Sequence, residues 1–199
     1  MSNFAKQLSF ITNTAVKKNI LFIIGSLRKL SFNRSLAKIA EKIIDKRANI
    51  SYLDYHDVPL INQDIEFPAP TAVTQLRDTI SRADAVWIFC PEYNYSYPGH
   101  VKNILDWLSR PLVAGDYASP MPMTGKKVTL SGAGGAGATQ KCRAKLTELL
   151  KTMNVNLMPG PQTGVTLSSE SWKKNELKLT EEQQQELEKQ VETFLDFIA

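Results

Sequence analysis

The chain has 199 residues, of which 43% are hydrophobic and 22% charged, so it carries enough apolar material for one sizeable core. No stretch approaches the roughly 18 consecutive apolar residues that a membrane-spanning helix needs, and we expect no membrane span. The excess of 24 Lys and Arg over 20 Asp and Glu gives a net charge of +4, which favours anionic partners without naming one.

Residues 1–18 are mixed in polarity, and we interpret them as an extension rather than a secretory signal. Residues 19–199 are expected to form a single domain. The two cysteines, Cys90 and Cys142, are too few for a disulfide framework and lie in no zinc-binding cluster. We therefore expect a cytoplasmic setting, no metal site, and both thiols in the core.

From Asn19 onward, short apolar runs alternate with segments at helical spacing, which is typical of a parallel sheet covered by helices on both faces. The first and third runs are continuously apolar, as expected for strands buried on both sides. The expected strands are residues 20–24, 49–54, 85–90, 127–130 and 155–158. Apolar stripes at helical spacing follow at residues 36–44, 73–80, 101–108, 142–153 and 187–198.

The segments between these elements are expected to be loops, including residues 55–70, 131–137 and 159–171. Thr180 and Gln183 form a capping box that predicts the start of the last helix. The whole pattern predicts a three-layer, doubly wound α/β domain with a parallel five-stranded sheet. Ligands bind such sheets beyond the carboxyl ends of the strands, which selects the segments after the first, third and fourth strands.

The segment after the first strand, residues 25–33, opens directly into a helix. Backbone amides at a helix N-terminus stabilise a phosphate, and Ser26, Ser31, Asn33 and Arg28 add side-chain donors and a charge. Alternatively, Ser31 or Asn33 merely caps the helix and Arg28 is solvated. Because no Gly-Lys-Ser/Thr and no closely spaced glycines follow, a terminal monophosphate fits better than a bridging pyrophosphate.

The segment after the third strand, residues 91–100, holds three tyrosines among proline and glycine. Exposed aromatic rings on a rigid loop favour contact with a flat ring, although Tyr95 and Tyr97 are equally expected to pack on a neighbouring helix or a partner subunit. Residues 132–137 match the Gly-x-Gly-x-x-Gly pattern of dinucleotide sites. They follow the fourth strand instead of the first, so we interpret them as backbone that passes close to a ring.

Three groups of residues resemble the NAD(P)H-dependent FMN reductases of the flavodoxin-like superfamily, a family that includes bacterial quinone, chromate and azo-dye reductases. The resemblance extends from about Ile20 to about Leu150. It rests on Gly25-Ser26-x-Arg28-x-x-Ser31-x-Asn33, on Pro91-Glu92-Tyr93-Asn94 with Pro98-Gly99-x-x-Lys102-Asn103 and Asp106-Trp107, and on Ser131-Gly132.

The resemblance implies a flavodoxin-like sheet with strand order 2-1-3-4-5, a tightly but noncovalently bound FMN, and NADPH or NADH as electron donor. It also implies a homodimer or homotetramer. No catalytic side chain is implied, because the chemistry belongs to the flavin. The implied FMN-binding residues are Ser26, Arg28, Ser31, Phe32 and Asn33 at the phosphate, Pro91, Glu92, Tyr93 and Asn94 at the isoalloxazine, and Ser131 and Gly132 on its remaining side.

The expected function is therefore the transfer of two electrons from NAD(P)H through FMN to quinones or other small acceptors, such as chromate, azo compounds or free flavin. A flavodoxin-like electron carrier is the alternative, although its usual strongly acidic surface is absent. No nucleic acid is expected, because Lys and Arg are dispersed among Asp and Glu. His100 stands where the family pattern has a small or apolar residue, and it either assists protonation of a bound quinone or is incidental.

Overall fold

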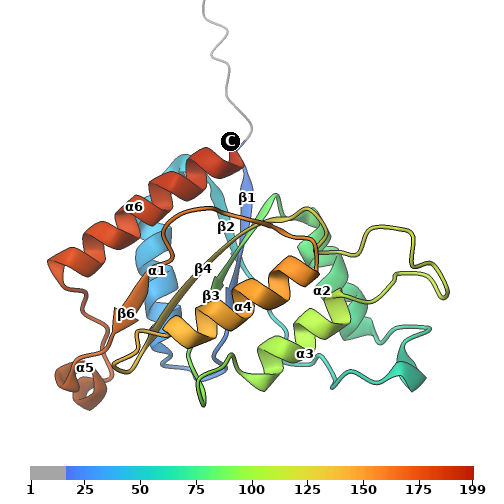
Figure 1. The fold of residues 1–199 in the computed structure, drawn as a ribbon, viewed down its shortest axis with the longest axis horizontal. Helices are drawn as coiled ribbons and strands as arrows, with labels where there is room; N and C mark the ends of the chain where they lie inside the picture. The colour runs from blue at the N-terminus through green and yellow to red at the C-terminus, as the bar shows by residue number, and fades with distance from the viewer. Residues whose placement is uncertain (1–16) are drawn as a thin grey trace, which may run out of the picture.

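The computed structural model describes residues 17–199, so most of the predicted extension, residues 1–18, lies outside the described residues. Figure 1 shows a twisted sheet between two layers of helices. The elements in chain order are β1 (Asn19–Ile24), α1 (Phe32–Ile44), η1 (Asp45–Arg47), β2 (Asn49–Tyr52), η2 (Gln63–Ile65), α2 (Thr71–Arg82), β3 (Ala85–Phe89), α3 (Gly99–Leu108), β4 (Lys127–Gly134), α4 (Gln140–Thr152), β5 (Asn156–Leu157), β6 (Gly164–Thr166), α5 (Ser169–Lys174) and α6 (Glu181–Ile198).

The strands pair in parallel in the order β2-β1-β3-β4-β5, which confirms the predicted flavodoxin-like topology. Side chains alternate across β1, so Leu21 packs into one core and Phe22 into the other. Helices α2, α3 and α4 cover the first of these cores, and α1 and α6 cover the second. No helix in the described part of the chain is long and apolar enough to cross a membrane.

The predicted boundaries are wrong around β4. This strand continues to Gly134, four residues beyond the predicted end, and β6 and the start of α5 fall in the segment that the sequence predicted as a loop. The physical reason is a change of partner: Lys127 and Val128 pair with β5, whereas residues 132–134 pair with β6. A strand of three residues that is stabilised by a distant partner leaves little local signal.

The last helix begins as predicted. The Thr180 hydroxyl accepts from the Gln183 N–H at 3.2 Å, and the Gln183 side chain accepts from the Thr180 N–H at 3.1 Å. Both predicted core cysteines are free and buried.

Candidate functional site

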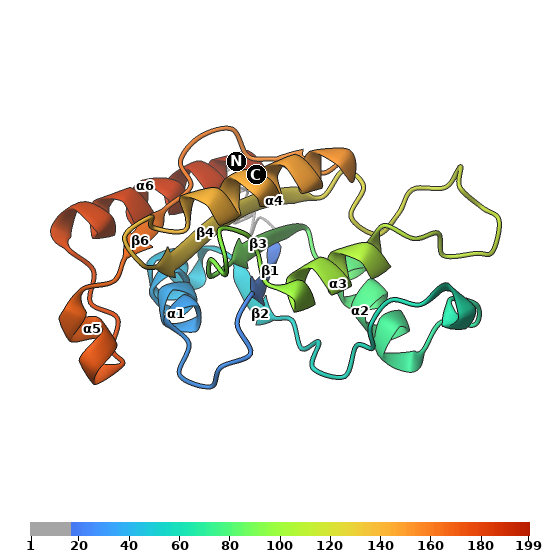
Figure 2. The same ribbon diagram turned by 60° about the horizontal axis from the view of Figure 1, so that its bottom comes forward.

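β1, β3 and β4 run side by side to the carboxyl edge of the sheet, where β1 and β3 end and β4 continues to Gly134 (Figure 2). The strand pairing continues one residue beyond β1 and β3, because Gly25 N–H donates to the Phe89 carbonyl and Cys90 N–H donates to the Ser131 carbonyl, both at 2.8 Å. The first loop (residues 25–31) and the second loop (residues 90–98) therefore begin side by side, and the third loop (residues 135–139) returns from the end of β4 to pack Thr139 against Gly132. This is the edge at which open parallel sheets bind ligands.

The first loop leads into the N-terminus of α1, where Ser31 is the N-cap. Its hydroxyl accepts from Arg34 N–H at 3.4 Å, so Ser31 caps the helix, as the alternative interpretation of this loop predicted. The preceding N–H groups, those of Phe32 and Asn33, have no acceptor within the helix. Since Ser26 is also buried beside them, the loop offers backbone and hydroxyl donors at the positive end of a helix dipole.

Asn33 joins the first loop to the end of β4. Its Oδ1 accepts from Ala133 N–H at 2.9 Å, and its Nδ2 donates to the Ala133 carbonyl at 3.0 Å. The residue is 3% exposed, so both bonds are shielded from water. The Asn33 side chain therefore fixes the position of the loop. Contact between Asn33 and a phosphate stays a prediction, for which the residue still has its backbone N–H and the second hydrogen on Nδ2.

Arg28 and Phe32 contact a part of the chain that the sequence did not connect with them. The Arg28 guanidinium lies 4.9 Å from the centre of the Phe32 ring, and its Nη1 donates to Asn175 Oδ1. The Phe32 ring is also edge-on to Trp172, with ring centres 5.1 Å apart. Sequence reasoning missed Trp172 and Asn175, although Ser168 before the segment and Asn175 after it are helix start and stop signals.

The second loop contains a tight two-residue turn. Tyr93 and Ser96 exchange backbone hydrogen bonds of 2.9 and 3.0 Å, and Asn94 and Tyr95 between them have φ of 51° and 60°. Such turns need positive φ at both central positions, which suits asparagine and strains tyrosine. Tyr93 and Tyr95 are exposed, and Lys141 Nζ lies 3.8 Å from the centre of the Tyr95 ring. The turn therefore presents aromatic rings at the edge of the sheet.

Glu92 caps a helix with its side chain. The N-cap residue of α4, Thr139, has a left-handed φ of 59° and makes no side-chain cap bond. Glu92 Oε2 instead accepts from Cys142 N–H, in the first turn of α4, at 3.0 Å. A carboxylate is favourable at this end of a helix. The predicted contact of Glu92 and the buried Pro91 with a flat ring would consequently use their backbone and the proline ring.

Ser131 does not face the carboxyl edge. Its hydroxyl is fully buried, accepts from Trp87 Nε1 at 3.0 Å and donates to Gln190 Oε1 of α6 at 2.8 Å. The extended β4 explains this, because successive side chains of a strand point to opposite faces of the sheet. The Ser131 carbonyl already accepts from Cys90 N–H, and the implied role of Ser131 in cofactor binding stays a prediction.

Gly132 is needed for close packing. A Cβ at this position would lie 2.2 Å from Thr139 Oγ1 and 2.4 Å from the Cys90 carbonyl oxygen. The absence of a side chain lets Thr139 of the third loop and the Cys90 carbonyl both pack against β4. The first glycines of the glycine-rich run lie within β4, and the expected approach of this run to a flat ring stays a prediction.

The family-like residues of α3 hold the segment after β2 against the site. Asn103 Oδ1 accepts from Ile61 N–H and its Nδ2 donates to the Pro59 carbonyl, both at 2.8 Å. Trp107 Nε1 donates to the same carbonyl at 2.9 Å. This part of the pattern therefore positions a loop.

Tyr55 and His100 bind the two carbonyl groups at the base of the first loop. Tyr55 Oη donates to the Ile24 carbonyl at 2.6 Å, and His100 Nε2 lies 3.2 Å from the Gly25 carbonyl oxygen. Because a carbonyl only accepts, His100 must carry a hydrogen on Nε2. Burial lowers the pKa of His100 below its ordinary value. This residue is thus neutral at pH 7 and holds the loop, which favours a positioning role over protonation of a quinone.

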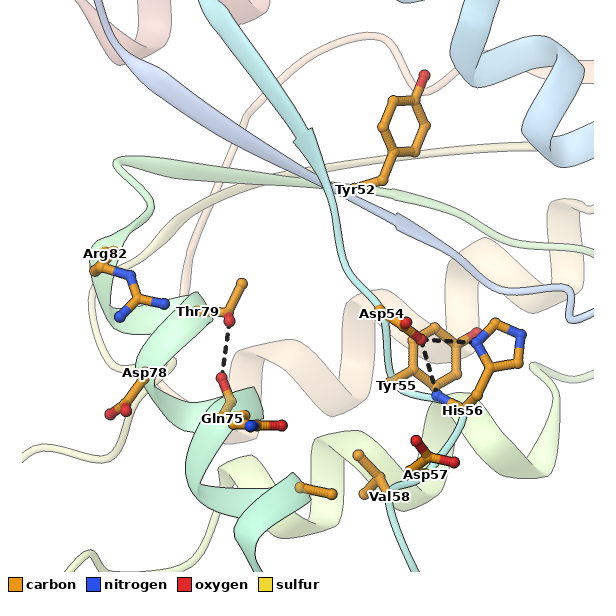
Figure 3. A pocket seen from close by; sticks show the side chains of 11 residues that line it. Tyr52, Asp54, Tyr55, His56, Asp57, Val58, Gln75, Asp78, Thr79 and Arg82 are labelled. Atoms are coloured by element: carbon orange, nitrogen blue, oxygen red, sulfur yellow. Dashed lines mark hydrogen bonds and ion pairs between the residues drawn. The ribbon is translucent and has the colours of Figure 1, made fainter.

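A cavity of about 520 Å³ lies outside the three loops, between the end of β2 and α2 (Figure 3). Its lining is mostly polar and includes Asp54, whose carboxylate is 2.8 Å from His56 Nδ1. The hydrogen bond from His56 lowers the pKa of Asp54. Within residues 17–199 no group of three or more His, Cys, Asp or Glu is arranged to hold a metal ion.

Cys90, at the end of β3, lies beneath the three loops. Its side chain is buried, and burial together with the neighbouring Cys142 thiol raises its pKa well above the ordinary value. A thiol in this state is protonated and unreactive at neutral pH. Cys90 therefore acts as a small core residue, as predicted.

Comparison with known families gives a match over residues 18–170 to the model described as NADPH-dependent FMN reductase. The chain is 35% identical over 151 residues to a quinone reductase of Escherichia coli K12, covering 73% of this chain and 76% of the relative. It is 32% identical over 149 residues to an NAD(P)H-dependent FMN reductase of Pseudomonas aeruginosa, covering 74% and 77%.

Solved structures agree with the sequence relatives. The flavoenzyme NAD(P)H:(acceptor) oxidoreductase of Paracoccus denitrificans is similar with a TM-score of 0.79 and 31% identity, over 91% of this chain and 97% of that one. A flavodoxin from the domain Archaea is similar with a TM-score of 0.57 and 14% identity, over 90% and 98%. The second likeness shows the fold alone.

Proposed function

This chain belongs to the NADPH-dependent FMN reductase family, and from that premise we propose where it holds FMN and which acceptors it reduces. It is an NAD(P)H-dependent oxidoreductase that uses FMN. We place the FMN phosphate at the first loop and the isoalloxazine ring against the second and third loops. The observation that carries this placement is the concentration of anion donors at the first loop.

The donor set of the first loop fits a phosphate. Ser26 and Ser31 supply hydroxyls, Arg28 supplies a guanidinium, and the N–H groups of Phe32 and Asn33 begin α1. The first acidic residue after Gly25 is Glu41, so no carboxylate of this stretch competes for these donors. Partial positive charge at the helix N-terminus adds to the attraction for an anion.

The second and third loops fit the edge and faces of a planar ring. Pro91 and Glu92 bring backbone to the carboxyl edge, while the turn at Asn94 directs the Tyr93 ring outward. Gly132 and its neighbours let the backbone of β4 approach closely from the other side. Backbone donors and acceptors with an apolar wall are typical of cofactor sites.

The residues of this chain bind and orient, and the redox chemistry comes from the cofactor. When bound, FMN accepts a hydride from NAD(P)H and delivers two electrons to the acceptor. Asn33 and His100 hold the first loop in register with β4 and α3, which keeps the phosphate donors at a fixed distance from the second loop. No protein side chain is required to transfer a proton in this account.

We propose quinones as the principal acceptor class, because relatives at about 35% identity are named quinone reductases.

A homodimer or homotetramer is supported by exposed apolar side chains at Tyr93, Tyr95, Leu112, Val113 and Tyr117. A cytoplasmic setting is supported by the two free, buried cysteines. Light scattering of the purified protein tests the oligomeric state.

The proposed function is tested by the absorption spectrum of the purified protein and by turnover. Flavin bands that bleach when NADPH is added without oxygen, and steady NADPH oxidation with a soluble benzoquinone, are the expected results. Flavin bands without NADPH oxidation, but with one-electron exchange to a protein partner, would favour the electron-carrier alternative. A protein that neither carries nor takes up FMN would contradict the proposal.

A further inference from the structure

The segment around α5 lies against the first loop, although more than 130 residues separate the two in the sequence (Figure 2). Trp172 packs edge-on against Phe32, with an angle of 80° between the ring planes. Asn175 makes two contacts: its Oδ1 accepts from Arg28 Nη1 at 2.5 Å, and its Nδ2 lies 3.5 Å from the Leu30 carbonyl. One short segment thus touches the middle of the loop and the end that leads into α1.

The local structure fixes the direction of the Asn175 side chain. Ser168 caps α5 by accepting from Ser171 N–H at 3.0 Å, and Ser171 is buried. The helix ends at Asn175, whose backbone is left-handed, with φ 53° and ψ 39°, and whose N–H donates to the Ser171 carbonyl. Asparagine is among the few residues that adopt this conformation readily. The amide is therefore presented by a structured helix end.

Arg28 is restrained on two sides by these contacts. Its guanidinium lies over Phe32, and one of its five N–H donors is used by Asn175. An arginine on an exposed loop loses rotamer entropy when it is fixed by a ligand. Restraints that already exist before the ligand arrives remove part of this cost.

We propose that Asn175 is a positioning residue for the FMN phosphate, acting by holding Arg28 over Phe32 so that its remaining donors are available to the anion. This inference rests on the proposed function, because it assumes that the first loop binds the phosphate. Trp172 contributes by supporting the Phe32 ring. Asn175 lies beyond residues 18–170, the part of the chain matched by the family model.

The test compares FMN with riboflavin, which has the same ring and no phosphate. The variant Asn175→Gly keeps the left-handed backbone and removes only the amide. We expect its Kd for FMN to rise about tenfold and its Kd for riboflavin to stay unchanged, as measured by quenching of flavin fluorescence in the full-length protein. The matched control is Asn154→Gly, which changes another left-handed asparagine, φ 55°, at the far end of α4 and is expected to leave both constants unchanged.

The outcomes separate this inference from the proposed function. Equal loss of FMN and riboflavin affinity would show a general structural role and overturn the inference. Unchanged FMN affinity, or tighter binding because Arg28 is released from a competing amide, would overturn it as well. If the unmodified protein binds neither flavin, the proposed function itself fails and the inference falls with it.

Discussion

The first and second loops lie side by side at one edge of the sheet and are held in different ways. Three side chains tie the first loop to distant elements. Asn33, next to the loop, bonds to Ala133 of β4, His100 of α3 bonds to the Gly25 carbonyl, and Asn175 after α5 bonds to Arg28. The second loop has a tight turn of its own beyond the Glu92 carboxylate that caps α4, and Tyr93 and Tyr95 of that turn remain exposed. This difference indicates an anchoring function for the first loop and a contact surface at the second.

Gly132→Ala is expected to have the largest effect on stability, because it disrupts the packing of β4 against the start of the second loop. The new Cβ would overlap Thr139 Oγ1 and the backbone oxygen of Cys90. We expect a loss of about 3 kcal/mol or more in the free energy of unfolding, measured by urea denaturation. Gly135→Ala, with nothing within 4 Å of the new Cβ, is the control. Equal stability of the two variants would contradict the account.

Asn33→Ala would release the first loop and leave the second in place. The N–H and carbonyl of Ala133 would lose their buried partners, and we expect unfolding free energy to fall by about 2 kcal/mol. FMN affinity should fall with it, because the donors of the loop lose their fixed position. Asn33→Asp keeps the acceptor for Ala133 N–H but sets a buried carboxylate oxygen against the Ala133 carbonyl, so it should lose stability and FMN affinity as well. An Ala variant with wild-type stability would argue against the anchor.

Ser131→Ala tests whether this residue serves the site or only the core. Loss of its hydroxyl leaves Trp87 Nε1 without its partner, so stability should fall by about 1 kcal/mol in thermal denaturation. The affinity of the folded Ser131 variant for FMN should equal that of the unmodified protein. The exposed Ser109→Ala serves as control. A selective loss of FMN binding in the Ser131 variant would show that its side chain serves the site.

His100 gives the smallest effect, a pH dependence. Its pKa in the folded protein is lowered below the ordinary 6.5, so the unfolded chain takes up the proton first as the pH falls. Its contribution to stability is therefore complete above about pH 6.5 and is lost at lower pH. Wild-type protein should lose more stability than His100→Val between pH 7.5 and 5.5. Parallel stability curves would exclude this role, and His56→Asn controls for the neighbouring imidazole.

Local sequence patterns predict the parts of the fold that local interactions decide. β1 and β3 are continuous apolar runs that end at Gly25 and Pro91, and the Thr180 capping box marks α6. β6 is different, because three residues become a strand only by pairing with the far half of β4. The end of β4 was consequently misplaced, and the burial of the Ser131 side chain within this strand was not predicted.

The composition of the site was easier to predict than the partners of its side chains. Short polar residues before a helix indicate an anion site, but the sequence does not say that Asn33 bonds to Ala133 or that Glu92 caps α4. Such partners depend on how distant elements pack. The contact between Arg28 and Asn175 spans 147 positions and has no local signature.

The central claim, that the first loop anchors the FMN phosphate, is tested most directly by Arg28→Ala. We measure the Kd for FMN and for riboflavin in the variant and in the unmodified protein. The account predicts that the variant binds FMN about ten to a hundred times more weakly, with riboflavin affinity retained, because a charge-assisted contact to the phosphate is lost. Unchanged FMN affinity would contradict it.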